Sequence, residues 1–79
     1  MDRKELEAQV IELVANSYGV DASSLTVDSV FGEDLTGSSV QMVGLVSEIE
    51  NELDAMVALQ EAAGCKTIGE LVDLVEAEL

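Results

Sequence analysis

Two neighbouring hydroxyl side chains, Ser38 and Ser39, follow a long non-periodic segment and come directly before a helical pattern. A small polar residue at a helix start lies beside backbone N–H groups that have no partner within the helix. Hydrogen bonds from these groups and the helix dipole both favour a phosphate there. Ser39 is therefore suited to carrying a phosphate ester, and Ser38 is the predicted N-cap. The alternative interpretation is that both serines only cap the helix.

The sequence contains few residues that could support catalysis, metal binding or disulfide formation. Its 79 residues include no His and a single Cys, so neither a Cys/His metal site nor an internal disulfide can form. Cys65 lies in an apolar setting, which favours a buried structural thiol over a reactive one. No paired carboxylates or nucleophile and base occur at a useful spacing. We predict no catalytic residues, no metal site and no enzymatic activity.

The charge is strongly acidic, with 17 acidic residues against three basic ones and a formal net charge of −14. Nucleic acids and anionic membranes would be repelled, whereas basic patches on proteins are complementary. The first residues lack the apolar core of a signal sequence, and no stretch is long enough to span a bilayer. We therefore expect a cytoplasmic protein. We also expect a monomer, because mutual repulsion between acidic copies opposes self-association.

Four helical segments and no strand are predicted. Asp2 and Glu5 form a capping-box pattern that opens the first helix, which stops near Gly19, and residues 20–37 read as a long loop. The second helix follows Ser38. A short third helix ends at Gly64. The inward positions predicted for the first two helices are Leu6, Val10, Leu13, Val14 and Ser17, and then Met42, Leu45, Val46, Ile49 and Leu53.

The last helix is opened by a second capping-box pattern, Thr67 and Glu70. Its predicted inward positions are Ile68, Leu71, Val72, Val75 and Leu79. Hydrophobic residues make up 48% of the chain and aromatic residues only 3%, so the interior must be aliphatic. Such a core is suited to admitting an aliphatic chain, although an ordinary small bundle explains the composition equally well.

The order of these parts resembles the acyl carrier protein family from about Leu6 to the last helix. The resemblance rests on Tyr18-Gly19-Val20 at the end of the first helix and on Phe31-Gly32-Glu33-Asp34-Leu35 before the second. The family's attachment motif, Asp-Ser-Leu, falls on Ser38-Ser39-Val40. The fold that this implies is all-α: a four-helix bundle of three longer helices and one short one, with a long loop between the first two helices.

The resemblance also implies a single carrier domain over residues 1–79, with 4′-phosphopantetheine attached to Ser39. A separate transferase would attach this arm from coenzyme A with magnesium, and the arm's thiol would hold acyl groups as thioesters. Ser38 is the weaker candidate for attachment. Each residue of the predicted acyl-chain pocket has plain core packing as its alternative. The pocket candidates are Met42, Val43, Val46, Met56, Leu59, Ala62, Cys65 and Ile68.

The chain differs from the family pattern at the residues predicted to recognise partner enzymes. Members of the family usually carry acidic residues before the serine and along the exposed first turns of the following helix, where partner enzymes present Arg and Lys. Here the predicted recognition residues are neutral at Gln41 and Gly44 and acidic only at Glu48 and Glu52. We therefore expect a specialised member serving fatty-acid, lipid or polyketide-type biosynthesis through acyl-transfer or condensing enzymes. The alternatives are a peptidyl or aminoacyl carrier, or an unmodified acidic interaction module.

Overall fold

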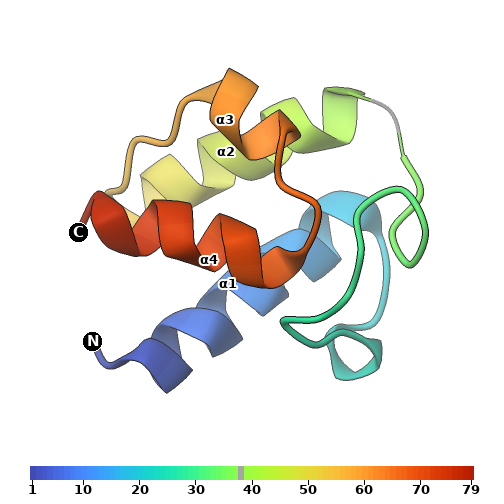
Figure 1. Cartoon of the computed structure of the whole chain (residues 1–79), viewed down its shortest axis with the longest axis horizontal. Coiled ribbons are helices and arrows are strands. Elements are labelled where there is room, and N and C mark those ends of the chain that lie inside the picture. The colour runs from blue at the N-terminus through green and yellow to red at the C-terminus, as the bar shows by residue number, and fades with distance from the viewer. Residues whose placement is uncertain (38) are drawn as a thin grey trace.

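In the part of the chain that the structure describes, four α-helices and one short 3₁₀ helix make up the regular structure (Figure 1). The computed structural model describes residues 1–37 and 39–79, and the side chain of residue 39 lies outside the described part. Among these residues there is no strand, which confirms the all-α prediction. The elements are α1 (Arg3–Tyr18), η1 (Ala22–Ser24), α2 (Ser39–Leu53), α3 (Leu59–Ala63) and α4 (Ile68–Ala77).

The ends of α1 are fixed by local hydrogen bonds, as the sequence predicts. The Asp2 carboxylate accepts the N–H of Glu5 at 2.8 Å, and this bond is the main cause that lowers the pKa of Asp2. At the other end Gly19 takes a left-handed conformation with φ of 67°, which a residue without Cβ adopts at no steric cost. The next N–H, from Val20, then returns to the Ala15 carbonyl.

The start of α4 follows its prediction with one difference. The Thr67 hydroxyl accepts the N–H of Glu70 at 3.2 Å, which is the expected half of a capping box. The Glu70 carboxylate accepts the N–H of Lys66 at 2.8 Å, one residue before the N-cap. The pair therefore satisfies two backbone donors at this turn.

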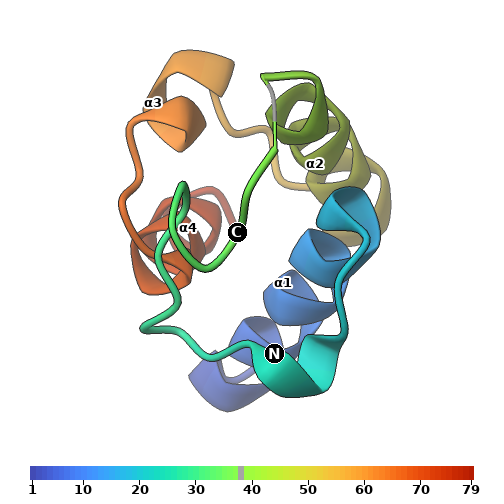
Figure 2. The same ribbon diagram turned by 90° about the vertical axis from the view of Figure 1, so that its right-hand side faces the viewer.

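The helices pack around one aliphatic core. α1 lies against α2 and α4, and α3 connects α2 to α4, as the turned view makes plain (Figure 2). The prediction that Leu79 points inward is wrong: this residue is 59% exposed, because α4 ends at Ala77. The largest fully buried side chains are Leu6, Val10, Val14, Leu35, Leu45, Ile49, Ile68, Leu71, Val72 and Val75.

The long loop between α1 and α2 is tied to the start of α4. The N–H of Phe31 donates to the Lys66 carbonyl at 2.9 Å, and the N–H of Gly69 donates to the Val27 carbonyl at 2.8 Å. A Cβ at residue 69 would lie 3.1 Å from that same Val27 oxygen, so the close approach favours glycine. The loop is thus held against the bundle by backbone hydrogen bonds.

Within this loop, residues 30–35 form a closed turn. The Asp34 carboxylate accepts the N–H of Val30 at 2.8 Å, and the N–H of Gly32 donates to the Leu35 carbonyl at 2.8 Å. Gly32 has φ of 91°, which favours glycine, and Leu35 is only 1% exposed. The Phe-Gly-Glu-Asp-Leu sequence therefore builds the turn that leads the chain to the start of α2.

Candidate functional site

The N-terminus of α2 is the candidate attachment point. Ser39 is the first residue of this helix, while Ser38 and the Ser39 side chain lie outside the described residues. Gly37 is exposed, and Val40 is 72% exposed. The described chain on both sides of the two serines therefore lies at the protein surface, within reach of another enzyme.

The electrostatics of this helix end suit a phosphodiester. The first turn of α2 contains no acidic residue, although the chain has 17 acids. The longer helices α1 and α4 both carry a glutamate in their first turns, Glu5 and Glu70. A nearby carboxylate would offset the positive end of the helix dipole and repel a phosphate. The first turn of α2 adds no such charge, and its backbone N–H groups and dipole suit the phosphate of a phosphopantetheine arm.

A cavity of about 500 Å³ lies beside this point. Gly37 and Met42 line it, and they stand two residues before and three residues after Ser39. Its remaining walls come from the end of α1, the long loop, α3 and the turn after α3. These walls are formed by Tyr18, Phe31, Gly32, Leu35, Leu59, Gln60, Ala63 and Cys65.

Three of the eight predicted pocket residues, Met42, Leu59 and Cys65, line this cavity. The other five lie elsewhere. Ala62 and Ile68 are fully buried in the core and Val46 is partly buried against it, while Val43 is 47% exposed and Met56 is 71% exposed.

The predicted pocket residues do not include Tyr18, Phe31, Leu35 and Gly37, which line this cavity, because the prediction considered the aliphatic interior between the helices. A usable signal was present. Tyr18 and Phe31 are the chain's two aromatic residues, and their ring centroids lie 5.9 Å apart. Large rings in an otherwise aliphatic protein would have indicated that the loop takes part in the interior.

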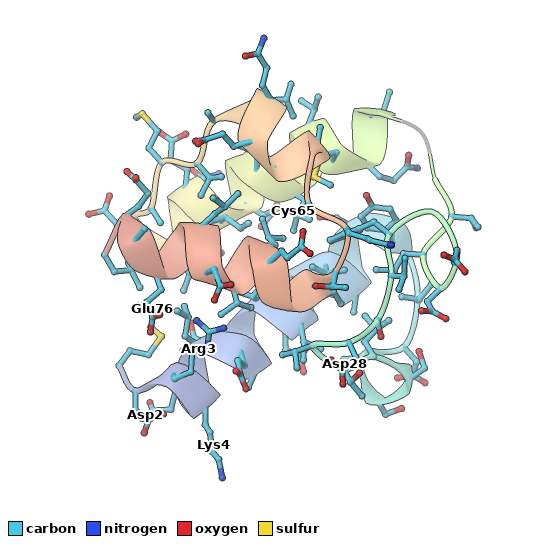
Figure 3. The ribbon with its side chains drawn as sticks, viewed as in Figure 1. Asp2, Arg3, Lys4, Asp28, Cys65 and Glu76 are labelled. Atoms are coloured by element: carbon cyan, nitrogen blue, oxygen red, sulfur yellow. The ribbon has the colours of Figure 1, made fainter. Side chains whose placement is uncertain are left out.

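Cys65, the single thiol, lies at the cavity wall, close to the carboxyl end of α3. It donates to the Glu61 carbonyl at 3.5 Å, and Figure 3 shows its sulfur at the side of the bundle that α3 covers. Burial raises the pKa of this thiol, and the carboxylates of Glu70, Asp73 and Glu61 raise it further. The group therefore remains a neutral thiol at pH 7, and its nucleophilicity is low.

The four predicted recognition residues lie along α2. Gln41 is partly buried, and Gly44, Glu48 and Glu52 are exposed. A Cβ at Gly44 would meet no atom within 4 Å, so the surface is open there. Among the described residues, no cluster of three or more acidic, Cys or His side chains could hold a metal ion. None of the helices in the described part is both long and apolar enough to cross a membrane.

Comparison with known proteins agrees with this geometry. A family model described as a phosphopantetheine attachment site matches residues 8–75. The chain is 36% identical over 75 residues to the acyl carrier protein of Rubrobacter xylanophilus, covering 95% of this chain and 93% of the other. It is 33% identical over 75 residues to that of Porphyromonas gingivalis, with coverages of 95% and 96%. A match to the Saccharopolyspora erythraea acyl carrier protein has 32% identity over 74 residues, covering 94% and 78% of the two chains.

These matches define the cofactor and the class of protein. The matched domain is one to which phosphopantetheine is attached, so the cofactor is 4′-phosphopantetheine and the protein is a carrier and not an enzyme. The all-helical fold is that expected of such a carrier. The family model and the relatives each span most of the sequence, and on these grounds the chain belongs to the acyl carrier protein family.

Proposed function

We propose that this chain is a single carrier domain whose arm is attached to Ser39 and whose cargo is an acyl group in a specialised biosynthetic pathway. The observation that carries the proposal is the position of Ser39. It begins a helix whose first turn has no acidic residue, next to a cavity of about 500 Å³. The attached arm and the cavity that would shelter its acyl cargo would then lie next to each other. We place this carrier in the cytoplasm.

The Ser39 hydroxyl needs no catalytic base within this chain, because the transferase supplies the base and the magnesium ion. The protein's own residues place Ser39 at a helix start whose described neighbours, Gly37 and Val40, are exposed, and the helix N–H groups and dipole would favour the arm's phosphate. Apolar walls next to the arm, including Met42 and Leu59, would shelter an aliphatic chain, and burial favours each CH₂ by about 0.8 kcal/mol.

Attachment is tested by incubating the protein with coenzyme A, magnesium and a broad-specificity phosphopantetheinyl transferase, followed by intact-mass measurement. We expect one arm on the unaltered protein and on Ser38→Ala, and none on Ser39→Ala. An arm on Ser39→Ala but not on Ser38→Ala would move the attachment point to Ser38. No arm on any variant, even with the transferase of the same organism, would favour an unmodified interaction module.

The cargo is tested by loading octanoyl and glycyl groups separately onto the arm and comparing amide NMR spectra. We expect the octanoyl form to shift the resonances of Phe31, Met42 and Leu59, because an apolar chain gains from entering the cavity. The glycyl form should leave them unchanged. Equal spectra for both forms would remove the argument for an acyl cargo and leave a peptidyl or aminoacyl carrier as the alternative.

A further inference from the structure

Tyr18 is the only tyrosine of the chain, and it lines the cavity beside the start of α2. Its ring is held on two sides. The ring of Phe31 packs against it with centroids 5.9 Å apart, and a Cβ at residue 37 would lie 3.2 Å from Tyr18 Cε2. The glycine at position 37 therefore leaves the space that the tyrosine ring occupies.

The hydroxyl end of this ring lies toward the attachment point. Cε2 is bonded to the ring carbon that carries the hydroxyl, so the edge of the ring next to Gly37 is the hydroxyl edge. Gly37 comes two residues before Ser39 in the sequence. The phenol of Tyr18 thus lies at the end of the cavity nearest the arm, whereas Leu59 and Cys65 line the cavity from α3 and the turn after it.

The Tyr18 hydroxyl makes no hydrogen bond within the part of the chain that the structure describes. In that part, no buried side-chain oxygen or nitrogen lacks a partner, so this hydroxyl is open to solvent. The residue as a whole is partly buried, and burial raises the pKa of its phenol. The group is therefore a neutral O–H donor at pH 7 that is available to a ligand.

A cargo that fills the cavity would cover this hydroxyl and displace the water around it. Burying a hydroxyl without a hydrogen-bond partner is unfavourable. A saturated chain has no atom that accepts from the phenol. A keto carbonyl does accept, and it brings no donor that would itself need a partner. Sites that hydrogen-bond a polar group of the ligand discriminate strongly against the analogue that lacks it.

The packing of the ring does not require the hydroxyl, because phenylalanine at position 18 would make the same contact with Phe31. The other polar side chains of the cavity wall are Gln60 and Cys65. Gln60 is exposed, so its amide stays in contact with water, and the Cys65 thiol already donates to the Glu61 carbonyl. Tyr18 is therefore the lining side chain whose donor a cargo inside the cavity can use.

We propose that Tyr18 determines the specificity of the cavity: its phenol donates a hydrogen bond to a keto carbonyl near the thioester end of the cargo, so the cavity prefers oxoacyl chains to saturated chains of the same length. The inference rests on the proposed function, since the cargo must be an acyl group on an arm that starts at Ser39. The carbonyl is placed near the thioester because the phenol lies at the Ser39 end of the cavity. The rest of the chain then lies against apolar walls such as Leu35 and Met42.

The preference is tested by loading octanoyl and 3-oxooctanoyl groups onto the arm from their coenzyme A thioesters. Amide NMR of Phe31, Met42 and Leu59 gives the ratio of inserted to free chain for each cargo. We expect this ratio to be about fivefold higher for the oxo chain in the unaltered protein. Tyr18→Phe should lower the ratio for the oxo chain by about fivefold and should not lower it for octanoyl.

Gln60→Met is the matched control, because it removes the other uncharged polar group of the wall while keeping a side chain of similar shape. It should leave both ratios unchanged. If Gln60→Met abolishes the preference and Tyr18→Phe does not, the inference is wrong. A fall of equal size for both cargoes in Tyr18→Phe, or no preference in the unaltered chain, would overturn it while leaving the acyl cargo in place. If neither cargo shifts the cavity resonances, the proposed acyl cargo and this inference both fail.

The single tyrosine also gives a direct signal from the phenol, which ¹³C at its Cζ makes visible. We expect the Cζ resonance of the 3-oxooctanoyl form to differ from that of the octanoyl form. The arm without cargo should leave this resonance as it is in the bare chain. A shift on attachment of the arm alone, with no further shift on loading the oxo chain, would show that the phenol binds the arm and would overturn the inference.

Discussion

The ring of Tyr18, the last residue of α1, packs against the ring of Phe31 in the long loop, with centroids 5.9 Å apart and planes inclined by 44°. Both rings line the cavity beside the start of α2. Partial burial raises the pKa of the Tyr18 phenol, so it stays neutral over the physiological range. This contact holds the loop to the end of α1 and thereby fixes one wall of the cavity.

Replacing Phe31 by Leu removes the ring contact while keeping an apolar side chain. We expect the free energy of unfolding to fall by about 1 kcal/mol. Tyr18→Phe is the control, because it keeps both rings and should change stability little. Urea unfolding followed by circular dichroism measures both variants at one salt concentration. Equal urea midpoints for Phe31→Leu and Tyr18→Phe would show that the ring pair does not hold the loop.

Glycines 44 and 69 give opposite predictions. A Cβ at Gly44 meets nothing within 4 Å, so Gly44→Ala should stabilise α2 by about 0.5–1 kcal/mol through the helix propensity of Ala. A Cβ at Gly69 would lie 3.1 Å from the Val27 carbonyl oxygen. Gly69→Ala should therefore destabilise the protein by forcing the loop away from α4. The same urea experiment compares them, and a shift of both in one direction would contradict the local geometry.

The helix ends could be predicted from sequence because their causes are local. Asp2 and Thr67 each lie three residues before the N–H that they accept, and Gly19 follows directly on the helix that it ends. The short α3 was predicted with its correct end at Gly64. The inward position predicted for Leu79 is wrong because the apolar pattern of α4 continues past Ala77, whereas the helix ends there.

The full set of cavity walls could not be predicted from local sequence patterns, because these walls depend on contacts between distant parts of the chain. Phe31 reaches the cavity only because its loop is bonded to residues 66–69, and no local pattern specifies that pairing. Ala62 and Ile68 had the apolar character of pocket residues, yet both are fully buried in the core. Apolar character alone therefore does not separate core from cavity wall, and it does not always mark an inward position, since Val43 and Met56 are apolar and exposed.

Cys65 should react slowly with iodoacetamide at pH 7. Its pKa is raised by burial and by three carboxylates, so the reactive thiolate forms only above the ordinary thiol range of about 8.5. We expect the rate in the folded protein to lie below that of free cysteine and to increase as the pH rises above that range. Unfolding in urea should restore the rate of free cysteine. A folded-state rate equal to that of free cysteine at pH 7 would contradict the assignment.

Arg3 joins the first turn of α1 to α4. Its guanidinium contacts Asp73 at 2.7 Å, Glu76 at 3.0 Å and Glu7 at 3.0 Å, and Figure 3 shows it directed toward Glu76. Hydrogen bonds to Asp73 and Glu7 raise the pKa of Arg3. Arg3→Gln should lower the urea midpoint at low salt, and the loss should shrink at high salt because ions screen exposed pairs.

Lys4→Gln is the matched control for Arg3→Gln, since it removes one positive charge from the neighbouring exposed residue. Any effect of net charge alone is common to both variants. Only the excess loss in Arg3→Gln reports the connection between α1 and α4. Identical midpoints for the two variants at low salt would mean that the ion pairs add nothing to stability.

Acidic residues at positions 41 and 44 should change which enzymes the carrier serves. We expect Gln41→Glu/Gly44→Glu to raise kcat/KM with condensing enzymes of ordinary fatty-acid synthesis by about threefold, through the charge attraction that the native neutral surface lacks. Ser47→Glu/Asn51→Glu adds the same charge at exposed positions farther along α2 and serves as control. An equal gain with both double variants would mean that net charge alone governs recognition, and no gain for Gln41→Glu/Gly44→Glu would remove the argument for a specialised partner.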